Sequence, residues 1–447
     1  MGPNYRRPET ELPDQWRWKE ASPRDEEAKG PWWELFKDAE LNRLQQLALE
    51  QNQDLKAAFA RVDKARAHAR VTSAAFFPDI NANPSWQRYR TSSTTVASFP
   101  VQSITANDFH VPIDLSYEVD LWGKVRRSFE SARSEWLAST SDFENLLFSL
   151  QSDVGQNYYR LRGVDHEIEI LNSAVKLRQQ NLEIFEARAK AGYSSQLEVT
   201  RSQTELATAK ATLADAERRR ASLVNDLALL CGSTDADLEV PPLAVSLEPP
   251  EIKPGLPSQL LERRPDVAAA ERRLTARNAE IGVAYAAFFP SIRLTGSGGF
   301  QSADLQDLFH WESRVWSFGP GITIPISSVG VTGARIKEAR AAYDEAVAQY
   351  RQSILVAFRD VDDSLASLRF LKNQAEASTD AAGSARKSAE LSIARYKNGV
   401  VDYLNVIDAE RSRLDNELQL ARVNTERMVQ TIRLVKAIGG GWMEAKE

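Results

Sequence analysis

The chain repeats itself once, and this internal duplication limits what it can fold into. Residues 74–80 (Ala-Ala-Phe-Phe-Pro-Asp-Ile) return as residues 286–292 (Ala-Ala-Phe-Phe-Pro-Ser-Ile). Further matches follow in the same order at offsets of about 207 to 212 residues: 131–133 with 338–340, 187–192 with 394–399, and Leu197 and Val199 with Leu404 and Val406. So long a period describes two copies of one large unit, and not a solenoid of short repeats. The content of one unit therefore decides the function.

Charge and composition exclude several classes of function. The net charge of the 447 residues is −6, which argues against a nucleic-acid-binding surface. No stretch approaches the ~18 consecutive apolar residues of a membrane helix, although membrane β-strands give a much weaker signal. A single cysteine, Cys231, excludes an internal disulfide framework and a multi-cysteine metal site. The class of function must therefore be inferred from the pattern of strands and helices.

Each unit contains two segments in which apolar and polar residues alternate, the pattern of a β-strand with one apolar face. From Phe109 to Leu121 the odd positions are apolar and the even positions, such as His110 and Asp120, are mostly charged or polar. Similar alternation predicts strands at residues 79–90, 108–121, 291–301 and 314–326. An ordinary antiparallel sheet with one face on a soluble core would also produce this pattern.

The number of strands favours a membrane sheet that several copies of the chain complete. Each segment has about 10 residues or more, the length of a tilted membrane strand. Four strands leave two open edges, which lipid does not tolerate, and membrane barrels need at least ~8 strands to close. Three copies of four strands would supply twelve. We therefore expect an oligomer if this sheet lies in a membrane.

The helices are long and carry a heptad pattern. Residues 124–191 contain no proline, and apolar residues recur there at every seventh position: Leu147, Val154, Leu161, Ile168, Val175 and Leu182. The second unit repeats the pattern with Val347, Ile354, Val361 and Leu368. A strict period of seven predicts coiled-coil packing with a left-handed supercoil. Gly192 and Gly399 follow the two long helices and favour the left-handed conformation that ends a helix, so each unit is expected to end in a tight helical hairpin.

These patterns predict a mainly α fold with long coiled-coil helices and four strands per chain, which would form a β-barrel portion if the sheet lies in a membrane. The expected divisions are an extended N-terminal arm (1–38), a first repeat (39–239), a proline-rich linker (240–257), a second repeat (258–438) and a C-terminal tail (439–447). Beside the strands, the first repeat is expected to hold a leading helix, a long helix at 124–191 and a helix at 197–230. The corresponding helices of the second repeat are a leading helix, 333–398 and 403–437.

No combination of residues predicts catalysis. The histidines His68, His110, His166 and His310 lack the spacing of metal ligands. Residues 384–387 match a bare Ser-x-x-Lys, a pattern that chance alone produces in a chain of this length. Residues 330–333 enter a helix but lack the Lys-Ser/Thr of a phosphate-binding loop. We therefore predict no enzyme, no cofactor and no metal site.

Five segments together carry the signature of a family: 2–8 (Gly-Pro-Asn-Tyr-Arg-Arg-Pro), 117–124 (Tyr-Glu-Val-Asp-Leu-Trp-Gly-Lys), 262–274, 279–292 and 395–399 (Arg-Tyr-Lys-Asn-Gly). In these segments the chain resembles the TolC-like outer membrane factors, specifically the lipoprotein (NodT-type) branch of tripartite, RND-type efflux systems. The resemblance covers nearly the whole chain.

The resemblance implies a homotrimer with a twelve-strand β-barrel in the outer membrane of a Gram-negative bacterium, continuous with a twelve-helix tunnel through the periplasm. It implies a passive duct for efflux of drugs or other small molecules, without catalysis. The expected partners are a periplasmic adaptor protein, an inner-membrane RND-type pump and outer membrane lipid, and not nucleic acid. This branch also carries a lipid-modified cysteine just before the Gly-Pro-x-Tyr segment, where Met1 stands here. We expect the native precursor to carry that lipid anchor.

The resemblance also assigns a gate at the periplasmic end of the tunnel. Carried over by position, the residues that narrow the tunnel are Leu404 and Asp408, with Arg411 as a nearby partner and Asp402 as a second acidic candidate. The spacing places Leu404, Asp408 and Arg411 on one helix face. Three copies of Asp408 around an axis would form an acidic ring that favours cations and needs ion pairs to stay closed. The alternative is an exposed salt bridge worth a few tenths of a kcal/mol.

The two hairpin ends are the expected docking surface for the adaptor protein. The residues assigned to it are Gly192, Tyr193, Ser194, Gly399, Val400 and Val401. Helix termination alone also explains these residues.

Two other functions stay open. One is the outer membrane duct of a type I protein secretion system, which would use the same architecture. The other, from a different class, is a soluble coiled-coil scaffold. A scaffold would explain the long helices but not the strands beside them.

Overall fold

The computed structural model describes residues 2–8, 31–92, 104–234, 238–243, 248–250, 264–325 and 329–440. Most of the predicted N-terminal arm lies outside the described residues, as do most of the Ser/Thr-rich connection at 91–105 and much of the linker at 240–257. The start of the second repeat and residues 441–447 of the predicted tail are also outside them.

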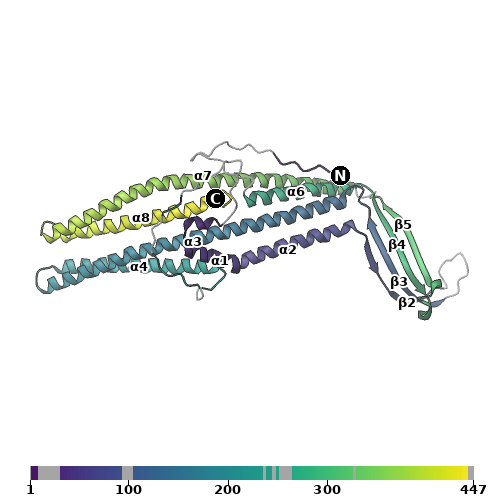
Figure 1. Ribbon diagram of the computed structural model, residues 1–447, viewed down its shortest axis with the longest axis horizontal. Coiled ribbons are helices and arrows are strands. Elements are labelled where there is room, and N and C mark those ends of the chain that lie inside the picture. Colours follow the sequence, from purple (N-terminus) through teal and green to yellow (C-terminus); the bar gives the residue numbers. More distant parts are fainter. Residues whose placement is uncertain are drawn as a thin grey trace, which may run out of the picture. The chain divides into compact units, whose positions relative to one another are not determined.

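Both repeats contain the same order of elements (Figure 1). After a short 3-10 helix at Trp32–Phe36, the first repeat forms α1 (Ala39–Gln51), α2 (Gln53–Ser73), β1 (Asp79–Ala82), β2 (Ser85–Arg90), β3 (Thr105–Glu118), α3 (Lys124–Lys190) and α4 (Gln196–Leu230). The second forms α6 (Pro265–Ala286), β4 (Ser291–Ser302), β5 (Arg314–Thr323), α7 (Val329–Lys397) and α8 (Tyr403–Ala437). In each, a leading helix precedes two strand regions, a long helix and a shorter helix.

The leading helix of the first repeat is broken at Asn52, where the sequence pattern predicts one continuous helix. Asn52 has extended backbone angles (φ −58°, ψ 126°) and its side-chain Oδ1 accepts a hydrogen bond from the backbone N of Leu55 at 2.9 Å. Its Nδ2 donates to the carbonyl oxygen of Leu230 at 2.9 Å, at the end of α4. Asn52 therefore caps α2 and anchors the break to the neighbouring helix.

The first predicted strand, at 79–90, is also interrupted. β1 and β2 both pair antiparallel with β3, and Ala82 opposite Ile113 and Ser85 opposite His110 keep one common register. In this register Pro84 falls opposite Val111 and Pro112 falls opposite Asn83. Proline has no N–H to donate, so the ladder is lost at these positions while the strand continues in line.

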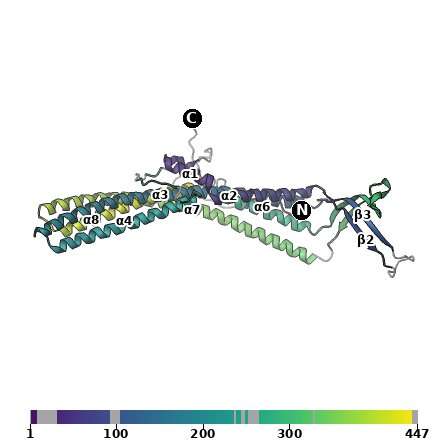
Figure 2. The ribbon, with the colours of Figure 1, turned by 90° about the horizontal axis from the view of Figure 1, so that it is seen from below.

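The strands form one antiparallel sheet with β1 and β2 at one edge and β5 at the other, in the order β1/β2–β3–β4–β5 (Figure 1). Figure 2 shows β2 and β3 side by side. Pairing between Ile113 of β3 and Gly298 of β4 joins the two repeats, and Gly298 pairs in turn with Trp316 of β5. Gly299 is required there because a Cβ on it would lie 2.8 Å from the Cα of Pro112. Duplication thus produces one sheet with equal contributions from both repeats.

By packing, the chain divides into two compact units that cut across the repeats. One comprises Met1–Glu9, Arg61–Thr140 and Ala269–Tyr350, and contains the sheet. The other comprises Thr10–Ala60, Ser141–Ala268 and Arg351–Glu447, and contains α4, α8 and the parts of α3 and α7 that lead to the hairpin ends. Each unit therefore takes segments from both repeats, as expected if the two copies pack side by side.

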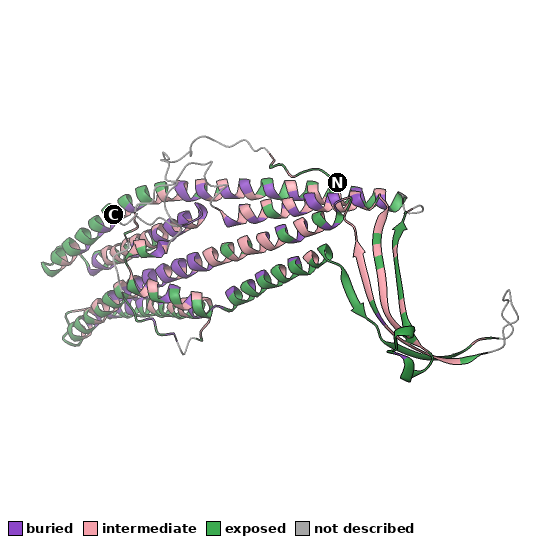
Figure 3. Ribbon diagram, turned by 45° about the vertical axis from the view of Figure 1, so that its right-hand side comes forward, coloured by how far each residue is buried: buried purple, intermediate pink, exposed green. Residues whose placement is uncertain are grey.

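Within the second unit, the helices pack through apolar stripes, which Figure 3 shows as buried turns alternating with exposed ones. Leu171 of α3, Ala216 of α4 and Leu418 of α8 form one such buried cluster. The sheet of the first unit differs, because its strands are largely exposed or half-buried. Among the helices of the described segments, none combines the length and apolarity that a membrane crossing requires.

Two short segments outside the repeats are held by specific polar contacts. In the N-terminal arm, Arg7 Nε donates to Glu271 Oε1 at 2.8 Å on α6. In the linker, the carbonyl oxygens of Val240 and Pro241 accept hydrogen bonds from Arg220 and Arg162, and both arginines contact the buried carboxylate of Asp165. The chain between the repeats is therefore attached to the helical hairpin α3–α4.

Candidate functional site

The two hairpin ends have the same backbone geometry. At the end of α3, Gly192 has φ +79°, and the backbone N of Tyr193 donates to the carbonyl oxygen of Arg188 at 2.9 Å. At the end of α7, Gly399 has φ +71°, and the backbone N of Val400 donates to that of Arg395 at the same distance. Both are the left-handed helix ends that the glycines predict. The chain therefore reverses within a few residues at each hairpin.

The helices that follow the turns are capped differently. Ser195 caps α4 through a capping box, in which the carboxylate of Glu198 accepts hydrogen bonds from the backbone N of Ser195 (2.9 Å) and the hydroxyl of Ser194 (2.6 Å). The bond from Ser194 is the main reason that the pKa of Glu198 is lowered. Asp402 is the N-cap of α8, but its side chain makes no capping hydrogen bond and is exposed. The turn at Asp402 therefore lacks the side-chain cap of its counterpart.

The first turns of α8 present two different faces. Tyr403, Val406 and Ile407 are buried against α3 and α4 in a common apolar cluster. The Tyr403 hydroxyl lies 3.1 Å from that of Ser202 on α4. Leu404 is 45% exposed, and Asp408 and Arg411 are also exposed. We call Leu404, Asp408 and Arg411 the gate face, since all three are exposed and their spacing places them on one side of α8.

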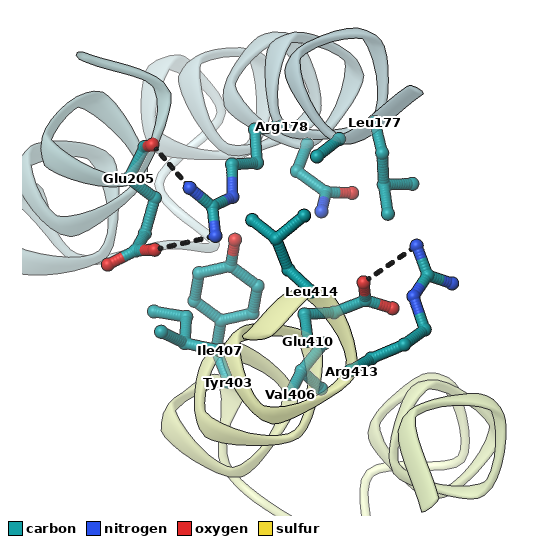
Figure 4. Close-up of a pocket in the computed structure, with 11 residues that line it drawn as sticks. Leu177, Arg178, Glu205, Tyr403, Val406, Ile407, Glu410, Arg413 and Leu414 are labelled. Atoms are coloured by element: carbon teal, nitrogen blue, oxygen red, sulfur yellow. Dashed lines mark hydrogen bonds and ion pairs between the residues drawn. The ribbon is translucent and has the colours of Figure 1, made fainter. Parts of the chain in front are cut away.

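The cationic end of the gate face forms its ion pair with α4, while Asp408 acts on Arg411 only through its charge. Arg411 Nη2 forms an ion pair with Glu205 Oε1. Arg178 of α3 approaches the other oxygen of Glu205 at 3.4 Å and donates to its backbone carbonyl at 2.9 Å (Figure 4). The hydrogen bond to Glu205 is the main reason that the pKa of Arg411 is raised. Within the described residues, no hydrogen bond or ion pair involves Asp408.

A small cavity lies directly behind this contact. Its volume is about 20 Å³, roughly the room that one water needs, and Arg178, Glu205, Tyr403 and Glu410 are among its lining residues (Figure 4). Burial raises the pKa of Glu410, although Arg413 lies 3.2 Å from its carboxylate. The inner side of α8 thus carries a second, mostly buried ion pair.

The candidate adaptor-docking residues lie at the exposed hairpin ends. Tyr193 is 87% exposed and Val400 is 61% exposed, far more than apolar side chains in a packed core. A Cβ added at Gly192 or Gly399 would meet no atom within 4 Å, so space alone does not require glycine there. Glycine is instead favoured by the positive φ angles at these two positions.

The sequence did not indicate Glu205 or Arg178 as partners of the gate face. Glu205 and Arg411 are separated by 206 positions, nearly the offset between the repeats. Equivalent helices α4 and α8 lie side by side, and this repeat symmetry is the signal that could have found the pair. No group of three or more possible metal ligands occurs among the described residues. The arrangement offers ion pairs and packing between helices, and no constellation of reacting groups.

Comparison with known proteins identifies the family. The profile of the outer membrane efflux protein family matches residues 44–233 and 256–440, one match for each repeat. OprJ of Pseudomonas aeruginosa, an outer membrane protein, is 35% identical over 100% of this chain and 94% of its own length. SrpC of Pseudomonas putida, the outer membrane protein of a solvent efflux pump, is 36% identical over 92% of this chain and 87% of its own length.

A solved structure shows the same fold. The CmeC outer membrane channel of Campylobacter jejuni superimposes with a TM-score of 0.92 at 25% sequence identity, covering 100% of this chain and 96% of that chain. The chain described here belongs to the outer membrane efflux protein family. Its fold is that of the TolC-like outer membrane channels, as the sequence motifs predicted.

Proposed function

We propose that the chain is the outer membrane exit duct of a tripartite efflux pump, through which small molecules leave the cell passively. The observation that carries this proposal is the exposed apolar face of a sheet that ends in two open edges. In the described residues β5 pairs only with β4, and β1 and β2 pair only with β3. Unpaired strand edges and an exposed apolar sheet face are stable in a folded protein when another surface, such as a second chain or lipid, covers them.

Three copies of the chain would satisfy both requirements. Four strand positions per copy give twelve, above the ~8 strands that a membrane barrel needs for closure. The apolar face of the sheet would then contact lipid, and its polar face would line the duct. The partners follow from the family architecture: an inner-membrane RND-type pump delivers the substrate, and a periplasmic adaptor protein connects pump and duct.

The gate is part of the same proposal. The gate face would point toward the duct axis in the trimer, where Leu404 and Asp408 from three copies would narrow the passage. The ion pair between Arg411 and Glu205 supports this arrangement, because it connects α8 to α4 and opposes a movement of α8 away from it. Asp402, exposed and without a capping bond, would add negative charge at the same mouth.

The hairpin ends would receive the adaptor protein. Gly192, Tyr193 and Ser194 form one end, and Gly399, Val400 and Val401 form the other. The exposure of Tyr193 and Val400 supports this role, since apolar side chains at a tight turn gain stability when a partner covers them.

The test is the mass of the protein extracted in mild detergent, together with its partitioning into membranes. A species near three times 50.0 kDa that needs detergent is the expected result. A soluble monomer or dimer would refute the duct and favour the coiled-coil scaffold. A second measurement distinguishes a small-molecule cargo, as for the solvent pump of SrpC, from a secreted polypeptide. It compares the tolerance to solvents and drugs of cells with and without the duct and its pump.

A further inference from the structure

The sheet has a continuous apolar face that ends abruptly at its loop end. Cross-strand pairing sets the rows of this face: Ile292–Ile322; Tyr117–Leu294–Pro320; Ile80–Leu115–Gly296–Phe318; Ala82–Ile113–Gly298–Trp316; Val111–Phe300–Arg314; and Trp86–Phe109–Ser302. Trp316 is 83% exposed and Phe318 is 71% exposed. The backbone N of Val119 bonds to the carbonyl oxygen of Ile292 at 2.8 Å, which extends the face to the helix end of the sheet.

The height of this face matches one membrane. The ten residue steps from Phe109 to Val119 span roughly 34 Å at ~3.4 Å each, and a strand tilt of ~40° reduces this to ~26 Å. The apolar band of a membrane barrel is ~25 Å tall. The row at Trp86 and Phe109, whose rings stack at a centroid distance of 6.2 Å, therefore falls at the outer boundary of the lipid core.

Arginines flank this boundary row on the same face, Arg88 one row beyond it and Arg314 one row before it. Arg88 follows Trp86 by two positions on β2, so its side chain leaves the same side of the sheet. Arg314 is the first residue of β5 and pairs across the sheet with Phe300. Its Nε donates to the carbonyl oxygen of Trp311 at 2.6 Å and its guanidinium lies over the Trp311 ring. Both edges of the sheet thus carry an arginine beside an exposed tryptophan.

The guanidinium groups are available for a ligand. Arg88 makes no hydrogen bond or ion pair within the part of the chain that the structure describes, and its side chain is exposed. Three carboxylates occur in the loop before β5, at Asp304, Asp307 and Glu312. None of them pairs with Arg88 or Arg314 in the described residues, and Asp307 instead contacts His310 at 3.4 Å.

We propose that Arg88 and Arg314, with Trp86 and Trp311, bind the phosphate groups of a phosphorylated outer-leaflet glycolipid whose acyl chains lie on the apolar face. This inference rests on the proposed membrane duct and adds a ligand to it. Arginine suits phosphate because its planar group can donate two parallel hydrogen bonds, and aromatic rings beside it fill the interface between acyl chains and headgroups. In a closed trimer the β5 edge meets the β1/β2 edge of the next copy, so each junction would carry both arginines.

The test uses native mass spectrometry of the trimer in detergent, titrated with bisphosphorylated lipid A or with lipid A whose phosphates have been removed. The double variant Arg88→Gln, Arg314→Gln is compared with Arg293→Gln, which removes an arginine from the polar face of the same sheet. The expected result is tighter binding of the phosphorylated lipid by the unaltered protein, and a loss of about tenfold or more in the double variant only.

Equal binding of both lipids by the unaltered protein would overturn the proposal, because only the acyl chains would then be recognised. Equal affinity of the double variant and the Arg293→Gln variant for the phosphorylated lipid would also overturn it. The lipid comparison needs no variant, so a folding defect does not hide the answer. Failure of the unaltered protein to form a detergent-dependent trimer would refute the duct itself, whereas an intact trimer without phosphate preference refutes only this inference.

Discussion

The ion pair between Arg411 and Glu205 allows the gate proposal to be tested with one substitution. Removing the guanidinium by Arg411→Ala leaves the Glu205 carboxylate in contact with Arg178, so no buried charge is left without a partner. The Arg411 side chain is 55% exposed, and an ion pair at such a site stabilises by ~1 kcal/mol. If all three copies must release α8 together, the closed state loses ~3 kcal/mol, which changes the open-to-closed ratio roughly 150-fold.

The assay is single-channel conductance in planar bilayers. Arg411→Ala should raise the mean conductance strongly, because the open state becomes more populated. The matched control is Arg427→Ala, which removes an arginine from α8 whose hydrogen bond goes to Asn424 of the same helix. Glu205→Gln should open the duct at least as much, since it removes the negative charge that pairs with both Arg411 and Arg178. Conductance of Arg411→Ala equal to that of the Arg427→Ala control would refute the idea that this ion pair holds α8 closed.

Three further predictions concern the sheet, the helix contacts and the buried thiol. Phe318→Arg, near the middle of the apolar face, should destabilise insertion into liposomes by ~2–4 kcal/mol per copy, whereas Ser297→Arg on the polar face should change the inserted fraction little. Gly163→Ala places a Cβ 2.9 Å from the Cβ of Thr425 on α8, so it should destabilise the helical unit by ~1–3 kcal/mol, measured as a lower melting temperature in detergent. Burial raises the pKa of Cys231 to about 11, so the native thiol should resist a disulfide reagent at a pH of ~8 and react after denaturation. The unfolded thiol ionises first, so this group's contribution to stability is lost as pH rises from the ordinary thiol pKa of 9.0 toward about 11.

The sequence pattern was informative wherever local chemistry decides the structure. The alternation from Phe109 onward predicted the two faces of β3, and the structure places the apolar side of that strand in the same rows as Phe300 and Phe318. Gly192 and Gly399 predicted helix ends with positive φ, because glycine alone takes that conformation at little cost. The same motifs predicted the family, which the comparisons confirm.

Interruptions within elements were harder to foresee. Asn52 fits the interior of a helical pattern, and its role as a cap depends on Leu230, which comes near only after folding. Pro84 lies within the predicted strand at 79–90, and the interruption there coincides with Pro112 lying nearly opposite on β3 while the register continues unbroken. In both places a long-range neighbour decides whether a local signal ends an element or only interrupts it.

The gate face shows the same limit. Spacing along α8 predicts that Leu404, Asp408 and Arg411 share one helix face, and the family resemblance implies Arg411 as a partner near Asp408. The structure instead brings in Glu205, whose side chain is only 9% exposed. An ion pair with a largely buried carboxylate stabilises the protein more than one with an exposed carboxylate, because water screens the exposed pair.

Differences between the two repeats point to α8 as the helix that can move. Ser195 and Glu198 fix the start of α4 with a complete capping box, and at the offset of the repeats these positions become Asp402 and Asn405. Asp402 makes no capping bond, and losing such a bond costs a helix ~1 kcal/mol. The start of α8 therefore depends on contacts with its neighbours: the apolar packing of Tyr403 and the ion pair of Arg411. A helix held mainly by such contacts can be released by breaking them, whereas α4 keeps its own cap, and this difference supports the proposal that α8 is the helix that moves at the gate.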